Sequence, residues 1–230
     1  MTTAFASTVL VLTFVVVTGS DAVAQDGQGR SVASVLESRG DEYVQKHRYR
    51  LAAVEFENAS ALKSVETSQR QELQAKSRLA LGMAAAQVEM KKFTKVGSPQ
   101  EAEKLSKAMI APLEICQKVF EPELAALAAA EYAKERLDIF GGAPMSIEVS
   151  PEYSELHVSA ALSEDLNTRS KTAKNFAGGW QRVAGQMKPG FTFYRISFVR
   201  PGQTSGMSYD GFVQVDGKWY AFPKVWRLAK

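Results

Sequence analysis

Residues 191–228 read FTFYRISFVRPGQTSGMSYDGFVQVDGKWYAFPKVWRL, and this stretch decides the fold. Its first part, residues 191–199, is aromatic and β-branched and contains neither Gly nor Pro, which predicts a strand. Side chains alternate between the two faces of a strand. One face therefore carries Tyr194, Ile196 and Phe198, and the other carries Phe191, Phe193, Arg195 and Ser197.

A hairpin is predicted to follow. Residues 212–215 and 218–222 are two more strand-like runs, and Asp216 and Gly217 join them. An Asp-Gly pair favours a type I′ turn, because both central residues of that turn need a positive φ. The two-residue loop also sets the register, which pairs Val215 with Lys218, Gln214 with Trp219 and Val213 with Tyr220.

Residues 31–142 are predicted to be a helical region, with a break near residues 39–41. The clearest helix covers residues 67–93. Ser98 and Glu101 have the spacing of a capping box at the start of the next helix. One face of the 67–93 helix carries apolar residues at steps of four and three, which indicates a contact with the core: Leu79, Met83, Ala86, Met90 and Phe93.

Residues 143–230 are predicted to form a sheet domain. Short strands at residues 146–149 and 154–160 would pair as a hairpin, and residues 163–187 would form a helix over the sheet. A cone-shaped fold could also recruit the helix from about residue 99. The expected fold class is therefore α+β, with an N-terminal helical region followed by a curved antiparallel sheet packed on helices.

The start of the chain is typical of a secretory signal peptide, residues 1–24. An apolar run at residues 9–17 precedes the small-residue pattern that ends at Ala24, which predicts cleavage between Ala24 and Gln25. The run is shorter than the ~20 apolar residues that span a bilayer, so an uncleaved anchor is only the alternative. We expect a secreted or periplasmic protein with a flexible leader at residues 25–30.

Charge and cysteine content exclude further classes. The 230 residues include 28 Lys and Arg and 25 Asp and Glu, a net charge of +3 that would become +4 (28 minus 24) when Asp21 leaves with the signal peptide. These charges are interspersed, so no nucleic-acid partner is expected. Cys116 is the only cysteine, which excludes an internal disulfide, and its apolar neighbours indicate a buried residue rather than a nucleophile.

The order of elements from about residue 105 to residue 228 is a long helix, two strands, a helix and three or more strands. It ends in Asp216-Gly217-Lys218-Trp219. This pattern resembles the nuclear transport factor 2-like superfamily, a cone-like α+β fold with a curved sheet over helices. The cystatin-like arrangement of one helix on an antiparallel sheet is also similar. The resemblance implies a cone into which enzymes of the superfamily project Asp, His or Tyr side chains.

His157 is the candidate catalytic residue. The chain has two histidines, His47 and His157, and neither has a second metal ligand at helical or strand spacing, so no metal and no cofactor is expected. His157 lies on a predicted strand near Tyr153 and Glu155, which makes it the better candidate for a general base. A half-exposed strand residue without a chemical role is the alternative.

Arg195 and Trp219 are the candidate ligand-binding residues. Arg195 shares its strand face with Phe191 and Phe193, so it would bind an anionic group if that face lined a pocket. On a solvent-facing surface it would be an ordinary arginine. Trp219 could line an aromatic cleft or could simply pack in the core.

The sequence therefore favours an exported, non-catalytic module that binds a small ligand or a protein. Two alternatives stay open. One is a cone-fold enzyme with an acid–base site around His157. The other is a structural protein that associates with the cell envelope through its helices, without a stable membrane span once the signal peptide is removed.

Overall fold

The computed structural model describes residues 30–166, 170 and 172–229. The predicted signal peptide, its cleavage site and most of the predicted leader lie outside these residues. The described chain is α+β, which confirms the expected fold class. The α-helices are α1 (Val32–Gln45), α2 (Tyr49–Ala61), α3 (Thr67–Met90), α4 (Pro99–Lys107), α5 (Leu113–Val119), α6 (Pro122–Tyr132), α7 (Ser163–Leu166) and α8 (Trp180–Val183).

The strands form one antiparallel sheet in the order β1-β2-β3-β4. Short 3-10 helices interrupt the connections between the other elements. The strands are β1 (Glu155–Leu162), β2 (Thr192–Val199), β3 (Gly206–Val215) and β4 (Lys218–Ala221), and the 3-10 helices are η1 (Lys91–Lys95), η2 (Asp138–Phe140), η3 (Ala173–Asn175), η4 (Ala184–Gln186) and η5 (Val225–Arg227).

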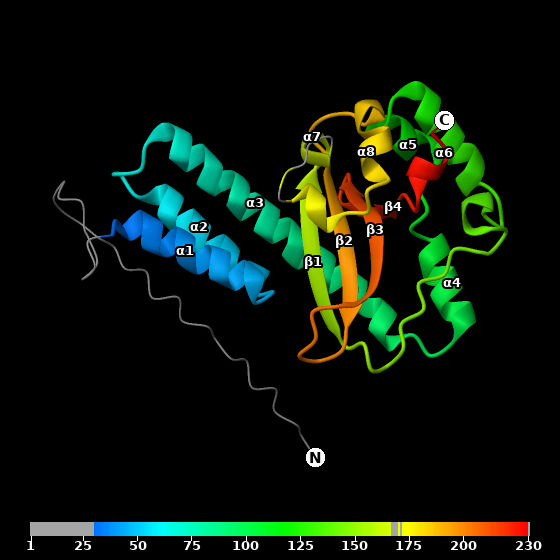
Figure 1. The fold of residues 1–230 in the computed structure, drawn as a ribbon, viewed down its shortest axis with the longest axis horizontal. Helices are drawn as coiled ribbons and strands as arrows, with labels where there is room; N and C mark the ends of the chain where they lie inside the picture. The colour runs from blue at the N-terminus through cyan, green and yellow to red at the C-terminus, as the bar shows by residue number, and fades with distance from the viewer. Residues whose placement is uncertain (1–29, 167–169, 171, 230) are drawn as a thin grey trace, which may run out of the picture.

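A helical arm projects from one side of the sheet (Figure 1). It consists of α1, α2 and the first half of α3, residues 32–80, and its helices pack closely. A Cβ at Gly40 would lie 2.4 Å from the Phe56 ring, so only glycine allows α1 to approach α2 this closely. The Lys76 ammonium on α3 lies 2.6 Å from the Glu37 carboxylate on α1. The second half of α3 then passes behind the sheet and packs on β1 and β2 (Figure 1).

The C-terminal hairpin has the predicted register, with Val215 opposite Lys218, Gln214 opposite Trp219 and Val213 opposite Tyr220. Its two turn residues both have positive φ, 50° at Asp216 and 78° at Gly217. The predicted stripe of the 67–93 helix is also confirmed as core, because its residues are buried except the half-buried Leu79. The hairpin register and the apolar stripe could both be predicted because each depends only on residues that are close together in the sequence.

Both edges of the sheet are covered, which prevents pairing with other chains. On the β1 side, the Tyr49 hydroxyl from α2 binds both backbone groups of Val158. On the β4 side, the Ala221 N–H donates to the Met109 carbonyl, and Ile110 bridges to Ala221 as a short parallel partner. The helical region therefore covers both edge strands of the sheet.

Three predicted elements differ in the structure. The break in the first helix lies after Gln45 instead of near residues 39–41, because Gly40 is buried inside α1 against α2. Residues 146–149 are not a strand, and β1 pairs with β2. Residues 163–187 are not one helix. Within the described part they form four short helical segments, α7, η3, α8 and η4.

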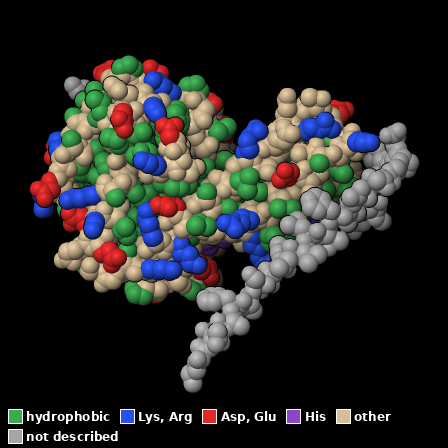
Figure 2. All heavy atoms as spheres, turned by 180° about the vertical axis from the view of Figure 1, so that it is seen from behind, with side chains coloured by type: hydrophobic (Ala, Val, Ile, Leu, Met, Phe, Trp, Pro, Cys, Tyr) green, Lys and Arg blue, Asp and Glu red, His purple; other side chains and the backbone are tan. Residues whose placement is uncertain are grey.

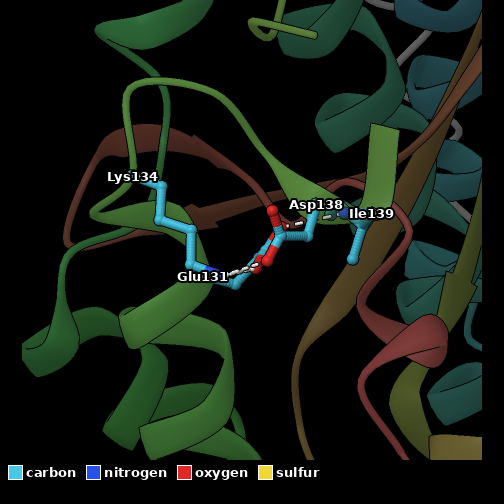
Figure 3. A network of polar contacts seen from close by, with 4 residues as sticks. All are labelled: Glu131, Lys134, Asp138 and Ile139. Atoms are coloured by element: carbon cyan, nitrogen blue, oxygen red, sulfur yellow. Dashed lines mark hydrogen bonds and ion pairs between the residues drawn. The ribbon is translucent and has the colours of Figure 1, made fainter. Parts of the chain in front are cut away.

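A buried carboxylate closes the turn after α6 (Figure 3). The Glu131 side chain is only 4% exposed, and its Oε1 accepts the Ile139 N–H at 2.9 Å. Its Oε2 lies 2.7 Å from the Lys134 Nζ, which also lies 2.6 Å from the Asp138 carboxylate. Each buried polar atom of Glu131 therefore has a partner, as a structural role requires.

No helix within the described residues is long and apolar enough to cross a membrane.

A bulge at Gly211 divides the sheet. Tyr194 lies opposite Phe212, whereas Arg195 lies opposite Asp210, so Gly211 has no partner on β2. Gly211 has a φ of 93°, and a Cβ there would lie 2.7 Å from the Phe222 carbonyl oxygen and 2.8 Å from the Trp180 ring. This close approach and the left-handed backbone both require glycine.

We expect Gly211→Ala to lower the free energy of unfolding by roughly 1–3 kcal/mol, because alanine would be strained at this φ and would displace the Trp180 ring. Urea unfolding of the purified protein measures the change. Gly185→Ala is the matched control, since nothing lies within 4 Å of its Cβ and its φ is not positive. Equal stability of the two variants would contradict the role given to the bulge.

Candidate functional site

On the side of the Gly211 bulge away from the β3–β4 turn, one face of the sheet is polar. Opposite residues on neighbouring strands share a face, and the register places two rows of polar side chains across β1, β2 and β3. Most of these side chains are half-buried, and we call the two rows the polar face. The first row is His157, Ser197 and Ser208, and the second is Ser159, Arg195 and Asp210.

The sequence placed His157 and Arg195 in different hypotheses, and the structure brings them to the same face. They lie in adjacent rows, because His157 is opposite Ser197 and Arg195 is opposite Ser159. Trp219 lies elsewhere: its ring packs edge-on against Tyr194 at 5.1 Å, and Tyr194 belongs to the opposite face. The three predicted site residues therefore do not form one site.

A second histidine covers His157. His47 lies in the loop between α1 and α2, and its ring stacks on that of His157 with 3.5 Å between centroids and 15° between planes. His47 has a φ of 56°, which turns the chain back from α1 into α2. Two residues 110 positions apart thus meet where the helical arm contacts the sheet.

The Tyr49 hydroxyl fixes this contact. Tyr49 is 1% exposed, and its oxygen lies 2.8 Å from the Val158 carbonyl, the Val158 nitrogen and the His47 Nδ1. The hydroxyl has one proton, which it donates to the carbonyl, so it accepts from the Val158 N–H and from a His47 Nδ1–H. This arrangement satisfies every group and assigns the Nδ1–H tautomer to neutral His47.

Both histidines favour the neutral form. Burial lowers the pKa of His47, and the adjacent His157 lowers it further, against the opposing effect of Glu155. Burial likewise lowers the pKa of His157, although the Glu155 carboxylate lies 3.9 Å from its Nε2 and favours the charged ring. Burial raises the pKa of Tyr49 to about 12, so its hydroxyl keeps its proton at physiological pH.

Arg195 is already engaged by the protein. It donates to the Asn175 carbonyl, and its Nε lies 3.5 Å from the Asp210 Oδ1. That contact is an ion pair without a hydrogen bond, so the buried Oδ1 has no hydrogen-bond partner, while Oδ2 accepts the Ala177 N–H at 3.0 Å. Burial raises the pKa of Asp210 despite both contacts. Arg195 and Asp210 thus hold the segment around residues 175–177 on the sheet, and a ligand role for Arg195 stays a prediction.

The remaining chemistry of the described residues is limited. No three His, Cys, Asp or Glu side chains in this part of the chain converge as metal ligands. The two imidazoles lie face to face in nearly parallel planes, which is not the converging arrangement of two ligands on one ion. Cys116 is buried as expected, and burial raises its pKa to about 12, so the thiol is a poor nucleophile.

Two open depressions lie outside the polar face. One, of about 500 Å³, is beside Tyr194 near the β3–β4 turn, and its rim includes the ion pair between Lys118 and Asp216. The other, of about 750 Å³, lies where Arg200 stacks on the Tyr153 ring at 5.2 Å. Both depressions are open to solvent, whereas a typical small-molecule pocket encloses most of its ligand.

His47 was the less favoured of the two histidines in the sequence, and Tyr49 was not a candidate. They belong to Lys46-His-Arg-Tyr-Arg50, a short basic run around one aromatic residue. Arg48 and Arg50 are exposed, and their side chains have no hydrogen bond or ion pair with any described residue. The cluster of cations was a visible signal, but only the structure shows that His47 and Tyr49 within it contact the sheet.

We expect Tyr49→Phe to lower the free energy of unfolding by roughly 2–4 kcal/mol, because a buried polar group without a partner costs about 1–3 kcal/mol and Val158 would lose two hydrogen bonds. Thermal and urea unfolding measure the loss. Tyr43→Phe is the control, since the half-buried Tyr43 hydroxyl has no hydrogen bond to a described residue. A near-neutral Tyr49→Phe would show that Tyr49 does not fix the arm.

Comparison with known proteins does not assign the chain to a family. No protein-family profile, no curated protein and no solved structure matches it. The resemblance to the nuclear transport factor 2-like superfamily therefore stays a prediction, and the function must be argued from the site itself.

Proposed function

We propose that this protein is an exported binding module that recognises an anionic group, a carboxylate or a phosphate, where the helical arm meets the sheet. The site, called here the junction, consists of His47, Arg48, Arg50 and His157. One observation carries the proposal: Arg48 and Arg50 are exposed and unpaired within the described structure, yet the backbone between them is fixed by the buried Tyr49.

Cations on an ordered backbone are better anion receptors than cations on a flexible loop. An ordered backbone before binding reduces the entropy that binding must overcome. Guanidinium groups also match the planar, two-oxygen geometry of carboxylate and phosphate. Because Tyr49 bonds to the sheet on one side, its two neighbours start from an ordered backbone.

The two arginine side chains also lack a counter-ion among the described residues. Arg48 is the N-cap of α2, and no side chain caps that end of the helix. The positive end of a helix dipole disfavours nearby cations, so two arginines here are stabilised when an anion joins them. Lys and Arg side chains gather on both sides of the histidines, in the hollow between the arm and the sheet (Figure 2).

The alternatives have less support. A general base around His157 needs an accessible imidazole, but His47 covers one face of that ring and the His157 side chain is 17% exposed. Envelope association through the predicted stripe of α3 needs that stripe at the surface, but it is mostly buried. Binding at the junction needs neither condition.

Titration with inorganic phosphate and with citrate tests the proposal. The chain has two histidines, so their ring protons give two assignable NMR signals. We expect both anions to shift the His47 signal in a saturable manner, and the double variant Arg48→Gln/Arg50→Gln to bind about tenfold more weakly or worse, because charge-assisted hydrogen bonds are worth about 1.5–3 kcal/mol.

Arg78→Gln is the matched control, because Arg78 is an exposed, unpaired arginine on α3. It should bind both anions as the wild type does. Equal losses in the control and in the double variant would reduce the effect to net charge. Histidine signals that do not respond to either anion would contradict the proposal.

A further inference from the structure

The contact between the arm and the sheet contains two titratable rings face to face. The His47 and His157 centroids are 3.5 Å apart, and one ring belongs to the arm while the other belongs to β1. A stacked pair is stable when at least one ring is neutral, but two imidazolium rings at this distance repel each other. Both rings belong to the junction, but anion binding there does not depend on their stacking.

We propose that the stacked histidines are a proton-operated latch. With neutral rings, the loop between α1 and α2 lies on β1 and covers its edge. With both rings protonated, the loop leaves the strand and the backbone of Val158 becomes accessible. The latch is a property of the protein without ligand, so it can hold or fail independently of the junction's binding role.

The groups around the pair favour release over compensation. Among the described residues, Glu155 on β1 is the acidic group that acts on both rings. Its carboxylate lies 3.9 Å from His157 and is half-exposed. From α2, Tyr49 stays protonated, and Arg48 adds positive charge beside His47. From β2, Arg195 is paired with Asp210. One exposed carboxylate thus faces up to two new charges.

The hydrogen bonds do not themselves sense protons in this range. The His47 Nδ1–H donates to Tyr49 in the neutral ring and in the charged ring, since protonation adds its proton at Nε2. The Tyr49 hydroxyl keeps both bonds to Val158 until the loop moves. The pH response therefore resides in the rings themselves, through the burial of each ring and the repulsion between them.

The direction of the effect follows from the lowered pKa of both rings. An open loop returns each histidine to its ordinary pKa of about 6.5, so the open state binds more protons than the closed state. Closure is therefore most stable above that pH and weakens as pH falls through the lowered values of the closed state.

The second half of α3 stays in place when the loop leaves. It packs on β1 and β2, where a Cβ at Gly82 would lie 2.1 Å from the Tyr194 hydroxyl, and Gln87 donates to the Leu156 carbonyl. The movement is thus confined to the contact made by His47 and Tyr49. Val158, 5% exposed in the closed state, is the residue that reports it.

Amide hydrogen exchange of the full chain tests the latch between about pH 8 and about pH 5, the range in which histidine titrates. We expect the protection factor of the Val158 N–H to fall by up to about tenfold per pH unit for each proton taken up. The protection factor of Ile196, on the central strand β2, should stay constant. Constant Val158 protection across the range would overturn the proposal.

Variants separate charge from packing. His157→Phe keeps a stacked ring without its charge, so its Val158 protection should depend less on pH than that of the wild type, because only the buried His47 can still titrate. Glu155→Gln should make the loss of protection at acidic pH larger, because it removes the carboxylate that favours protonated rings in the closed state. A pH dependence in His157→Phe equal to that of the wild type would overturn the proposal.

Tyr49→Phe supplies the open reference. Without the hydroxyl, Val158 should exchange rapidly at every pH while Ile196 stays protected. Wild-type protection of Val158 in this variant would show that the loop does not cover the edge, and would overturn the latch as well.

Discussion

The hydroxyl of Tyr49 is the contact on which the arrangement of arm and sheet depends. An edge strand has backbone groups that must be paired, and here a side-chain oxygen both accepts from and donates to Val158. The hydroxyl cannot make these bonds unless α2 begins at the strand. The start of α2 therefore determines where His47, Arg48 and Arg50 lie, and the requirement to cover an edge places four cationic or titratable groups at one junction.

The bulge at Gly211 has a second organising effect. Before it, Phe193 packs on Trp180 at 5.0 Å between ring centroids, and the sheet face is apolar. After it, the same face carries Arg195 and Asp210. A bulge increases the local twist of a sheet, so the two halves of one face can point toward different neighbours. The apolar half belongs to the core, and the polar half is left for the solvent and the arm.

Local patterns in the sequence predicted the local structure. The Asp216-Gly217 turn has one compatible geometry, so its register could be derived in full. The helix predicted over residues 163–187 was wrong, because two adjacent glycines let the chain bend into short turns. A Cβ at Gly179 would lie 2.2 Å from the Trp226 ring. The meeting of His47 with His157 has no sequence signal, since it depends on how the arm docks.

Charge decides how firmly that docking holds. Two unit charges about 4 Å apart repel by about 4 kcal/mol at an effective dielectric constant of about 20, before screening by salt. The opposing hydrogen bonds of Tyr49 are worth about 0.5–1.5 kcal/mol each. Repulsion between protonated His47 and His157 is thus comparable to or larger than what the hydroxyl supplies, whereas neutral rings add attraction to it. The permanent charges of Arg48 and Arg50 do not change with pH, so the junction can gain charge only through its two histidines.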